Sequence, residues 1–378
     1  MAYNYSKMNT QPCLSIAYGI ASFLLLLGCD QRALNSSASK TSVQPQVIAY
    51  YSGGKDAIDQ YDLRGVSQLI YSFLHLKGNE LAIDNASDSL TLMHLTGLKK
   101  QYPQLKVLVS LGGWGGCKTC SEVFSSPQGR KDFAESTAQI IADYNADGID
   151  LDWEYPVVQG SHGHPVRKDD KDNFTELVKA LKKEMQPNDI LSFAAGGFPA
   201  YLEQSIDWAA VMPLISHVNI MSYDLYNSKE TGHHTPLYSN TSESRSTDRS
   251  VQYLLNIGVP ADQIVIGAAF YGRIWENVSC QNNGLFQPAQ FKRAIGYNNF
   301  DRLEPGYEFY WDDVAKAPYG YHPEKKLFLS FDDARSITLK TQYARENKLK
   351  GIMFWELAND RPQDGLLKAM IKASQSAD

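Results

Sequence analysis

The sequence contains no long run of basic residues, and its 36 lysines and arginines are outnumbered by 42 aspartates and glutamates. The resulting net charge of −6 gives no electrostatic footprint for nucleic acid, so we expect no nucleic acid partner. No short-period repeat is present, which argues against a solenoid. What is present is an ordinary globular composition, with 43% hydrophobic and 21% charged residues over 378 positions. This length suits one large domain of barrel size with an elaboration.

A hydrophobic run long enough for a comfortable membrane span is also missing. The apolar stretch at residues 13–28 is too short, and it lies where a secretory signal would lie. It ends in Leu26-Leu27-Gly28-Cys29, which resembles the lipoprotein box of bacteria. The resemblance implies that residues 1–28 are a signal peptide and that Cys29 becomes the lipidated first residue. An uncleaved anchor is the alternative interpretation.

The segment that follows the box, residues 29–46, is polar and rich in Ser, Thr and Ala, which is typical of a flexible tether. We therefore expect the folded part to span residues 47–378. The expected location is the bacterial cell envelope, with the protein attached to the inner or outer membrane through a lipid at Cys29, or secreted.

Few cysteines remain beyond the box. The spacing of Cys117 and Cys120 fits half a zinc site, a redox pair or a local disulfide. A zinc site would need two further ligands, and the available histidines lie in polar, loop-like stretches where solvated side chains are the favoured interpretation. These histidines are His162, His164, His233 and His234. The sequence therefore predicts no metal and no cofactor.

Short β-rich runs recur along the chain, most of them followed by a segment of helical character. The eight runs are residues 47–51, 68–73, 106–111, 148–154, 191–195, 217–223, 264–271 and 351–355. Alternating strands and helices predict a parallel sheet, and eight strands allow it to close into a TIM (β/α)8 barrel of the α/β class. The connection between the seventh and eighth runs is too long for a simple crossover. It predicts a small α+β insertion at about residues 274–326, followed by a helix at 332–347.

The fourth β-rich run carries an unusual set of acids. In a strand, side chains alternate between faces, so Asp150, Asp152 and Glu154 share one face and the apolar residues between them share the other. Three carboxyls pointing into a barrel would repel one another and lose hydration, which is costly for a purely structural strand. An inert acidic strand and a Mg²⁺ or Ca²⁺ site are the alternatives, and the second lacks nearby supporting ligands. Asp147 projects to the other face or caps the turn, so we assign it a structural role.

The same segment resembles glycoside hydrolase family 18, the chitinase family. Its D-x-x-D-x-D-x-E signature is matched by Asp147, Asp150, Asp152 and Glu154. Three further segments resemble motifs at the third, sixth and seventh strands of that family: SLGGW at 110–114, MSYD at 221–224 and FYGR at 270–273. The resemblance spans residues 47 to about 370, and the long seventh connection looks like the chitinase insertion domain of the bacterial members.

The resemblance implies a chitinase that hydrolyses β-1,4 linkages between N-acetylglucosamine units with retention, the substrate's own acetamido oxygen acting as nucleophile. Glu154 would be the general acid and base, kept protonated near neutral pH by its neighbours. Asp152 would orient the acetamido group, Asp150 would share a proton with Asp152, and Tyr223 would donate to the acetamido oxygen. Chitin or chito-oligosaccharides are the implied partners of a monomer.

Substrate contacts follow from the same resemblance. Most of the 22 Tyr, 15 Phe and 6 Trp are expected in the core, although such a content would suit stacking against sugar rings. The residues that the family motifs place at the ends of strands, and so in contact with sugars, are Tyr50, Phe73, Gly113, Trp114, Met221, Asp224, Tyr271, Arg273 and Trp355.

Two other functions use the same fold. A lectin would bind chitin without cleaving it, but such proteins typically lose the acid that stands here at Glu154. An endo-acting glycosidase on N-glycans or peptidoglycan would keep the same acids, and the expected insertion domain favours a deep cleft and hence chitin. No separate carbohydrate-binding module is expected, and the sequence leaves endo or exo action open.

Overall fold

The structure is a computed structural model that describes residues 44–226 and 228–376. The expected signal peptide, Cys29 and most of the expected tether lie outside these residues, so their assignments stay predictions. Gln46, the last residue of the expected tether, is already the first residue of a strand. Within the described part of the chain, no helix is long and apolar enough to cross a membrane.

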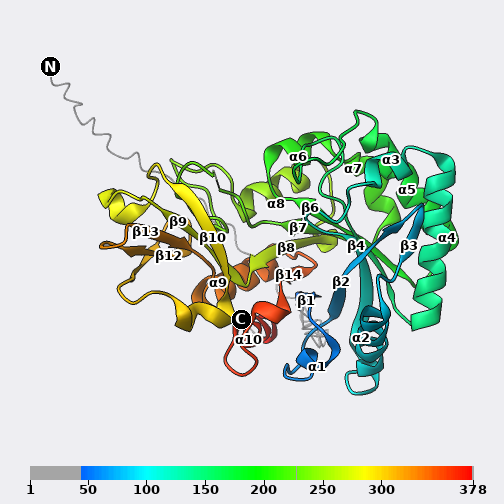
Figure 1. The fold of residues 1–378 in the computed structure, drawn as a ribbon, viewed down its shortest axis with the longest axis horizontal. Helices are drawn as coiled ribbons and strands as arrows, with labels where there is room; N and C mark the ends of the chain where they lie inside the picture. The colour runs from blue at the N-terminus through cyan, green and yellow to red at the C-terminus, as the bar shows by residue number, and fades with distance from the viewer. Residues whose placement is uncertain (1–43, 227, 377–378) are drawn as a thin grey trace, which may run out of the picture. The chain divides into compact units, whose positions relative to one another are not determined.

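Eight parallel strands form a closed barrel (Figure 1), as the sequence predicts. Their order is β1-β14-β8-β7-β6-β5-β4-β2, and a pairing between β1 and β2 closes the ring. The strands are β1 Gln46–Tyr51, β2 Gln68–Lys77, β4 Lys106–Gly112, β5 Gly148–Asp152, β6 Ile190–Gly196, β7 His217–Met221, β8 Ile264–Ala269 and β14 Gly351–Trp355. A short strand, β3 Glu80–Ala82, pairs antiparallel with the end of β2.

Three strands end two residues earlier than the sequence predicts. β5 ends at Asp152 rather than at Glu154, β7 ends at Met221 and β8 ends at Ala269. The ladder between β5 and β6 already stops at Leu151 and Phe193, because the neighbouring strands diverge at the mouth of the barrel. Glu154 therefore belongs to the loop after its strand.

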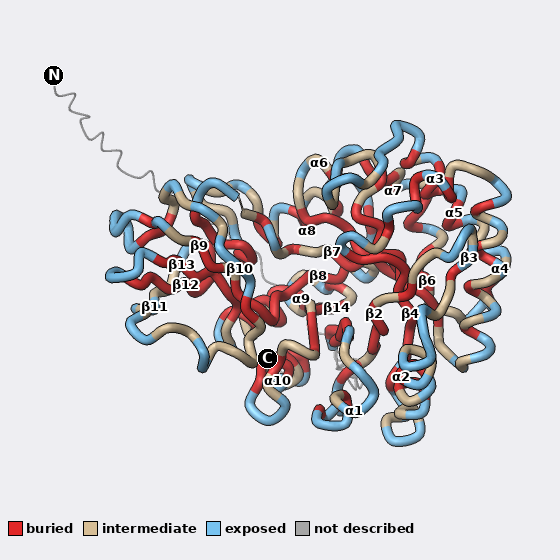
Figure 2. Tube along the Cα trace, viewed as in Figure 1, coloured by how far each residue is buried: buried red, intermediate tan, exposed pale blue. Residues whose placement is uncertain are grey.

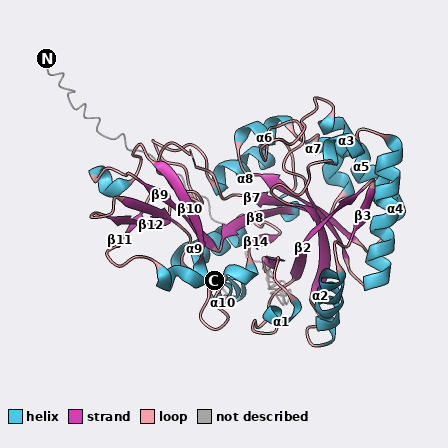
Figure 3. Ribbon diagram, viewed as in Figure 1, coloured by secondary structure: helices cyan, strands magenta, loops and turns pink. Residues whose placement is uncertain are grey.

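Helices cover the outside of the barrel (Figure 3). They are α1 Lys55–Ile58, α2 Ala86–Gly97, α3 Cys120–Phe124, α4 Pro127–Tyr144, α5 Asp170–Glu184, α6 Pro199–Gln204, α7 Trp208–Val211, α8 Thr247–Asn256, α9 Ala334–Glu346 and α10 Leu366–Gln375. The longest, α4, has a complete set of local signals: the Ser126 side chain caps its first turn, Pro127 stands at its first position, and Asn145 ends it in a left-handed conformation.

The core lies in two layers. The larger layer fills the space between the outward faces of the strands and the helices; it includes Ile149 and Leu151 of β5 and Phe174 of α5. The smaller layer plugs the barrel interior, and its buried members are Ile48, Tyr50, Ile70, Leu108, Val265 and Met353. Figure 2 shows the buried positions concentrated along the strands. Polar groups that point into the barrel above this plug are therefore screened from water, which is what raises the cost of charge there.

The long connection between β8 and β14 forms an antiparallel sheet of its own, as expected for an insertion. Its strand order is β10-β9-β13-β12-β11. The bounds are β9 Tyr271–Glu276, β10 Gln290–Gly296, β11 Glu308–Asp312, β12 Ala317–His322 and β13 Leu327–Ser330. Both faces of this sheet carry small apolar clusters, one around Trp275 and Phe328 and one around Ile274 and Leu329. The sheet starts directly after β8, so it grows out of the mouth of the barrel.

Two expectations about cysteine and histidine change. Cys117 and Cys120 form a disulfide, one of the three interpretations that their spacing allows, which argues against half a zinc site, and Cys280 is free and exposed. The prediction that His233 and His234 are solvated is wrong, because both are buried. Their polar segment folds back between the end of β7 and the insertion sheet, and polar composition alone does not reveal such cover.

Candidate active site

Asp150 lies at the bottom of the site, and hydrogen-bond donors from four strands surround it. Its Oδ2 accepts from the hydroxyl of Tyr50 at 2.8 Å and from Ser110 at 3.5 Å. Its Oδ1 accepts from Ser192 at 2.6 Å and from the amide of Asn219 at 3.0 Å. Burial raises the pKa of this carboxyl, and these donors act in the opposite direction. The net effect is a raised pKa, so the four donors reduce but do not cancel the cost of a charge deep in the barrel.

Asp152 lies two residues further along β5, nearer the mouth of the barrel, and its surroundings differ from those of Asp150. The side chain is buried, and its Oδ1 has no hydrogen-bond partner among the described residues. Burial raises its pKa well above the usual value, and the nearby charges of Glu154 and Asp150 raise it further. Asp152 therefore favours the protonated form and keeps one oxygen available to a ligand. No hydrogen bond joins Asp150 to Asp152 here, so the expected sharing of a proton between them stays a prediction.

Glu154 follows the strand and reaches the cavity. Burial is the main cause that raises its pKa to about 7, a hydrogen bond from the Tyr155 hydroxyl lowers it, and the charge of Asp224 raises it again. A carboxyl with this pKa exists in both forms near neutral pH, so it can donate a proton in one step and accept one in the next.

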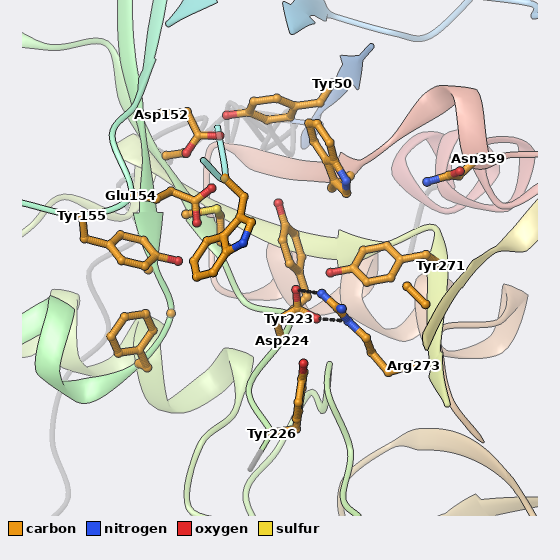
Figure 4. A pocket seen from close by; sticks show the side chains of 18 of the residues that line it. Tyr50, Asp152, Glu154, Tyr155, Tyr223, Asp224, Tyr226, Tyr271, Arg273 and Asn359 are labelled. Carbon is orange, nitrogen blue, oxygen red and sulfur yellow. Dashed lines mark hydrogen bonds and ion pairs between the residues drawn. The ribbon is translucent and has the colours of Figure 1, made fainter. Parts of the chain in front are cut away.

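These groups open into one cavity of about 820 Å³ at the C-terminal face of the barrel (Figure 4). Its polar and aromatic lining comes from both the barrel and the insertion sheet. The predicted site residues that line it are Tyr50, Phe73, Trp114, Asp152, Glu154, Met221, Tyr223, Asp224, Tyr271, Arg273 and Trp355. Active sites of TIM barrels lie at this face because the loops after the strands converge there.

Aromatic rings form the floor of the cavity. Trp355 stacks on Phe73 with ring centroids 5.4 Å apart and an interplanar angle of 17°, and Tyr50 lies 6.0 Å from Trp355. Gly113 does not itself line the cavity. A Cβ at Gly113 would come within 2.3 Å of the Phe73 ring, so this glycine leaves room for the floor. Trp114, with 66% of its surface exposed, stands at the rim.

An ion pair closes another side of the cavity. Arg273 of β9 donates from Nε to Asp224 Oδ1 at 2.7 Å and makes a second contact to Oδ2, as the dashed lines of Figure 4 show. The guanidinium also lies over the rings of Tyr271 and Tyr226. Burial raises the pKa of Asp224, but the neighbouring His234 and the charge and hydrogen bonds of Arg273 outweigh it and lower the pKa to about 2. Asp224 is therefore ionised throughout the neutral range.

Several cavity residues were not predicted from the sequence. They are Tyr155, Gln159, Phe198, Tyr226 and Asn359. Tyr155 directly follows Glu154, and Tyr226 follows Asp224 by two positions, so proximity to a motif is a signal that could have found them. Asn359 lies in a turn after β14, and no local pattern marks it.

Asp147 has no part in this cavity. It accepts hydrogen bonds from Lys99 at 3.0 Å, Lys106 at 3.1 Å and the backbone of Val107 at 2.9 Å, which join the start of β5 to β4. These contacts agree with the structural role that its odd spacing from Asp150 predicts.

A TIM barrel with a carboxyl of near-neutral pKa above an aromatic floor has the architecture of a glycoside hydrolase. Residues 46–360 match the family described as glycosyl hydrolases family 18. Since the match covers most of the chain, the protein belongs to this family and is a chitinase-like glycoside hydrolase.

Individual relatives agree with this assignment. Chitinase A1 of Niallia circulans is 33% identical over 296 residues, which cover 71% of this chain and 42% of that protein. Chitinase B of Serratia marcescens is 27% identical over 414 residues, which cover 91% of this chain and 82% of that protein. A solved family 18 N-acetylglucosaminidase from Paenibacillus barengoltzii is 32% identical, with a TM-score of 0.79 over 87% of this chain and 99% of that one. The relatives thus include both chitinases and an N-acetylglucosaminidase.

Proposed function

We propose that this protein is a chitinase that cleaves β-1,4 linkages between N-acetylglucosamine units with retention, using the substrate's acetamido oxygen as nucleophile. The observation that carries the proposal is the state of the carboxyls that line the cavity among the described residues: Asp152, Glu154 and Asp224. Asp224 is engaged by Arg273, and the raised pKa of Asp152 favours its uncharged form. Neither is suited to attack an anomeric carbon, which supports a nucleophile supplied by the substrate.

The proposed first step begins with Glu154, which donates its proton to the glycosidic oxygen as the bond to the anomeric carbon breaks. The acetamido oxygen then bonds to that carbon and forms an oxazolinium ion. Asp152, whose Oδ1 lacks a partner in the described residues, is suited to accept the acetamido N–H. Transfer of its proton to Asp150 in this step would give Asp152 the negative charge that offsets the oxazolinium ion. The Tyr223 hydroxyl lines the same cavity and is suited to donate to the acetamido oxygen.

In the second step, water attacks the anomeric carbon from the face that the leaving group occupied, and Glu154 takes its proton. The bond between the anomeric carbon and the acetamido oxygen breaks, which regenerates the N-acetyl group, while the proton taken from water regenerates the protonated acid. Two inversions give net retention. Trp355 and the rings around it provide an apolar bed for the sugar whose anomeric carbon reacts.

A polymer is the favoured substrate because the cavity is large and aromatic residues from several elements line it. Trp114, Tyr155 and Phe198 of the barrel loops form a chain of ring contacts there, and Tyr271 of the insertion sheet also lines it. A cavity of about 820 Å³ is in the range that encloses a drug-sized ligand rather than one small ring. Action on single terminal sugars, as the name of the Paenibacillus relative suggests, is the second candidate. Products from chitohexaose separate the two, since a chitinase releases oligomers and an exo-acting enzyme releases the monosaccharide first.

The mechanism has a test that depends on the nucleophile. Partly deacetylated chitosan should yield products whose new reducing ends are N-acetylglucosamine, initially as the β-anomer, because a free amine has no carbonyl oxygen to attack with. Proton NMR early in the digestion measures both features. Glucosamine at the new reducing ends, or an initial α-anomer, would show that a protein carboxylate or an activated water attacks directly.

A further inference from the structure

The carboxylate of Asp224 is held from two directions, and the mechanism above uses only one of them. Arg273 grips it from the insertion sheet. From the barrel side, Nδ1 of His234 lies 3.4 Å from Asp224 Oδ1, the same oxygen that accepts from Arg273 Nε. The His234 side chain is 0% exposed, and its ring leans on Tyr271 with centroids 5.2 Å apart. This histidine does not line the cavity itself.

The backbone around His234 is fixed on both sides. Its N–H donates to Ser330 Oγ and its carbonyl accepts from the N–H of Leu225, each at 2.9 Å. The next residue, Thr235, donates to Asp332, which forms a fully buried ion pair with Lys340. A ring on such a segment has little freedom to move away from Asp224.

His234 is suited to act as a neutral donor. Burial lowers its pKa, Asp224 and Asp332 raise it, and Arg273 lowers it, with a net lowering. The ring is therefore uncharged near neutral pH, and the tautomer that carries the proton on Nδ1 places a donor toward Asp224. At 3.4 Å the pair is within ion-pair distance but forms no hydrogen bond, and neither ring nitrogen of His234 has a hydrogen-bond partner among the described residues. Contacts of this length in catalytic sites often tighten when substrate binds.

We propose that His234 is a positioning residue that acts through Asp224: it holds the ionised carboxylate against Arg273 and beside Glu154, so that Asp224 presents a fixed negative charge to the proton donor. The inference rests on the proposed function for its effect on turnover, but not for its effect on Asp224. Arg273 holds Asp224 from β9, and His234 holds the same carboxylate from the segment after β7, whose backbone is bonded both to Leu225 and to Ser330 of the insertion sheet.

Two amide substitutions provide a matched test of which nitrogen of the His234 ring interacts with Asp224. His234→Asn places an amide N–H near the position of Nδ1, whereas His234→Gln places it near the position of Nε2. His234→Leu removes the donor altogether. We expect Leu and Gln to lower kcat/KM on chitotriose about tenfold, the usual effect of losing a hydrogen bond to a charged group, and Asn to restore most of that loss. Equal activity of the Asn and Gln variants would overturn the proposal.

A readout without substrate separates this proposal from the proposed function. We expect the titration of the Asp224 carboxyl, followed by carbon NMR of the labelled protein, to shift upward from about 2 in His234→Leu and His234→Gln but not in His234→Asn. The other groups that face Asp224 in this titration are Arg273, Glu154, Tyr223 and Tyr271. An unshifted titration in both His234→Leu and His234→Gln, which lack a donor at the Nδ1 position, would refute the role of His234, even if the protein cleaves chitin. A wild-type protein that cleaves no chito-oligosaccharide would refute the proposed function and leave the titration test valid.

A double-mutant cycle completes the test. If His234 acts through Asp224, His234→Leu should cost about tenfold in the wild-type background and almost nothing after Asp224→Asn. Additive losses would mean that His234 supports the fold in some other way, and the proposal would fall.

Discussion

At the residue scale, the chemistry of this site comes from the unequal surroundings of its acids. Asp224 has an arginine and a pKa lowered to about 2, whereas the four donors of Asp150 only partly oppose the rise in pKa that burial causes. Asp152 has an oxygen with no partner among the described residues, and Glu154 is held near neutrality by burial. Carboxyls of one intrinsic acidity thus acquire different states within one barrel mouth.

The pH dependence of Glu154 gives a prediction at this scale. Its raised pKa of about 7 means that the proton donor is present below that pH and is lost as the pH rises through it. We expect kcat/KM on chitotriose to fall above pH 7. Asp224→Asn should move this fall to lower pH, because the charge of Asp224 is one of the causes that raise the pKa of Glu154.

Glu154→Gln is the control for that profile. The variant should fold normally because the amide is nearly isosteric, and it should lose at least about a hundredfold in kcat with no remaining alkaline fall. Steady-state kinetics from pH 5 to 9 test both statements. Retention of more than about a tenth of the activity would remove Glu154 from its role.

At the scale of elements, the turn at the end of β4 combines glycines in left-handed backbone conformations with an exposed tryptophan. Gly112, Gly113 and Gly115 all have positive φ, of 105°, 76° and 87°. Trp114 stands among them with its ring 6.5 Å from that of Tyr155. The disulfide between Cys117 and Cys120 ties the end of this loop to the start of α3, and Ser121 next to it donates to the buried Asp170 at 2.7 Å. These ties hold the loop that presents Trp114 to the cavity.

Removing the disulfide should therefore affect the rim more than the chemistry. The double substitution Cys117→Ser, Cys120→Ser removes the cross-link that closes a loop of four residues. We expect the free energy of unfolding, measured in urea, to fall by about 2 kcal/mol. We expect a higher KM for chitohexaose, which reaches Trp114, and a nearly unchanged kcat. Cys280→Ser, at an exposed free cysteine, is the matched control and should change neither. A fall in kcat with KM unchanged would contradict this role of the loop.

At the scale of the whole molecule, the cavity exists because two sheets share it. Barrel loops bring Glu154 and Asp224, while the insertion sheet brings Arg273 and the backbone of Ala294 to Gly296. The buried pair of Lys340 and Asp332 lies where α9 returns from the insertion to the barrel, and Asp332 also accepts from the backbone N–H of Ala269 at the end of β8. A buried pair of this kind fixes one arrangement of its elements, because separating the charges would leave both without compensation.

The location of the whole protein is a proposal that rests on sequence alone. We propose that Cys29 carries a lipid that attaches the enzyme to a bacterial membrane, as the segment Leu26 to Cys29 indicates. Labelled palmitate should enter the full-length protein expressed in a bacterium and be absent from Cys29→Ser. A soluble, unlabelled wild-type product with a cleaved signal would exclude the lipid anchor.

Much of the fold could be predicted because its signals are local or periodic. The eight strands, the insertion after the seventh and the helix before the eighth all follow from alternation, length and turn composition. The inward direction of Asp150 and Asp152 follows from the alternation of a strand, and Glu154 completes a motif with specific spacing. The ends of β5, β7 and β8 were predicted two residues too late and the end of β2 four residues too early, because a sequence does not show where neighbouring strands diverge or continue to pair.

By itself, the sequence determined the barrel, the order of its elements and the identity of the acids, because backbone periodicity and motif spacing are properties of one segment at a time. Only the tertiary structure decided the surroundings that distinguish these acids. The four donors of Asp150 come from four strands and lie 40 to 100 positions from Asp150 in the sequence. His234 is buried beside Asp224 because the insertion folds over it. Charge states depend on burial and on neighbours, and both are set when distant segments pack together.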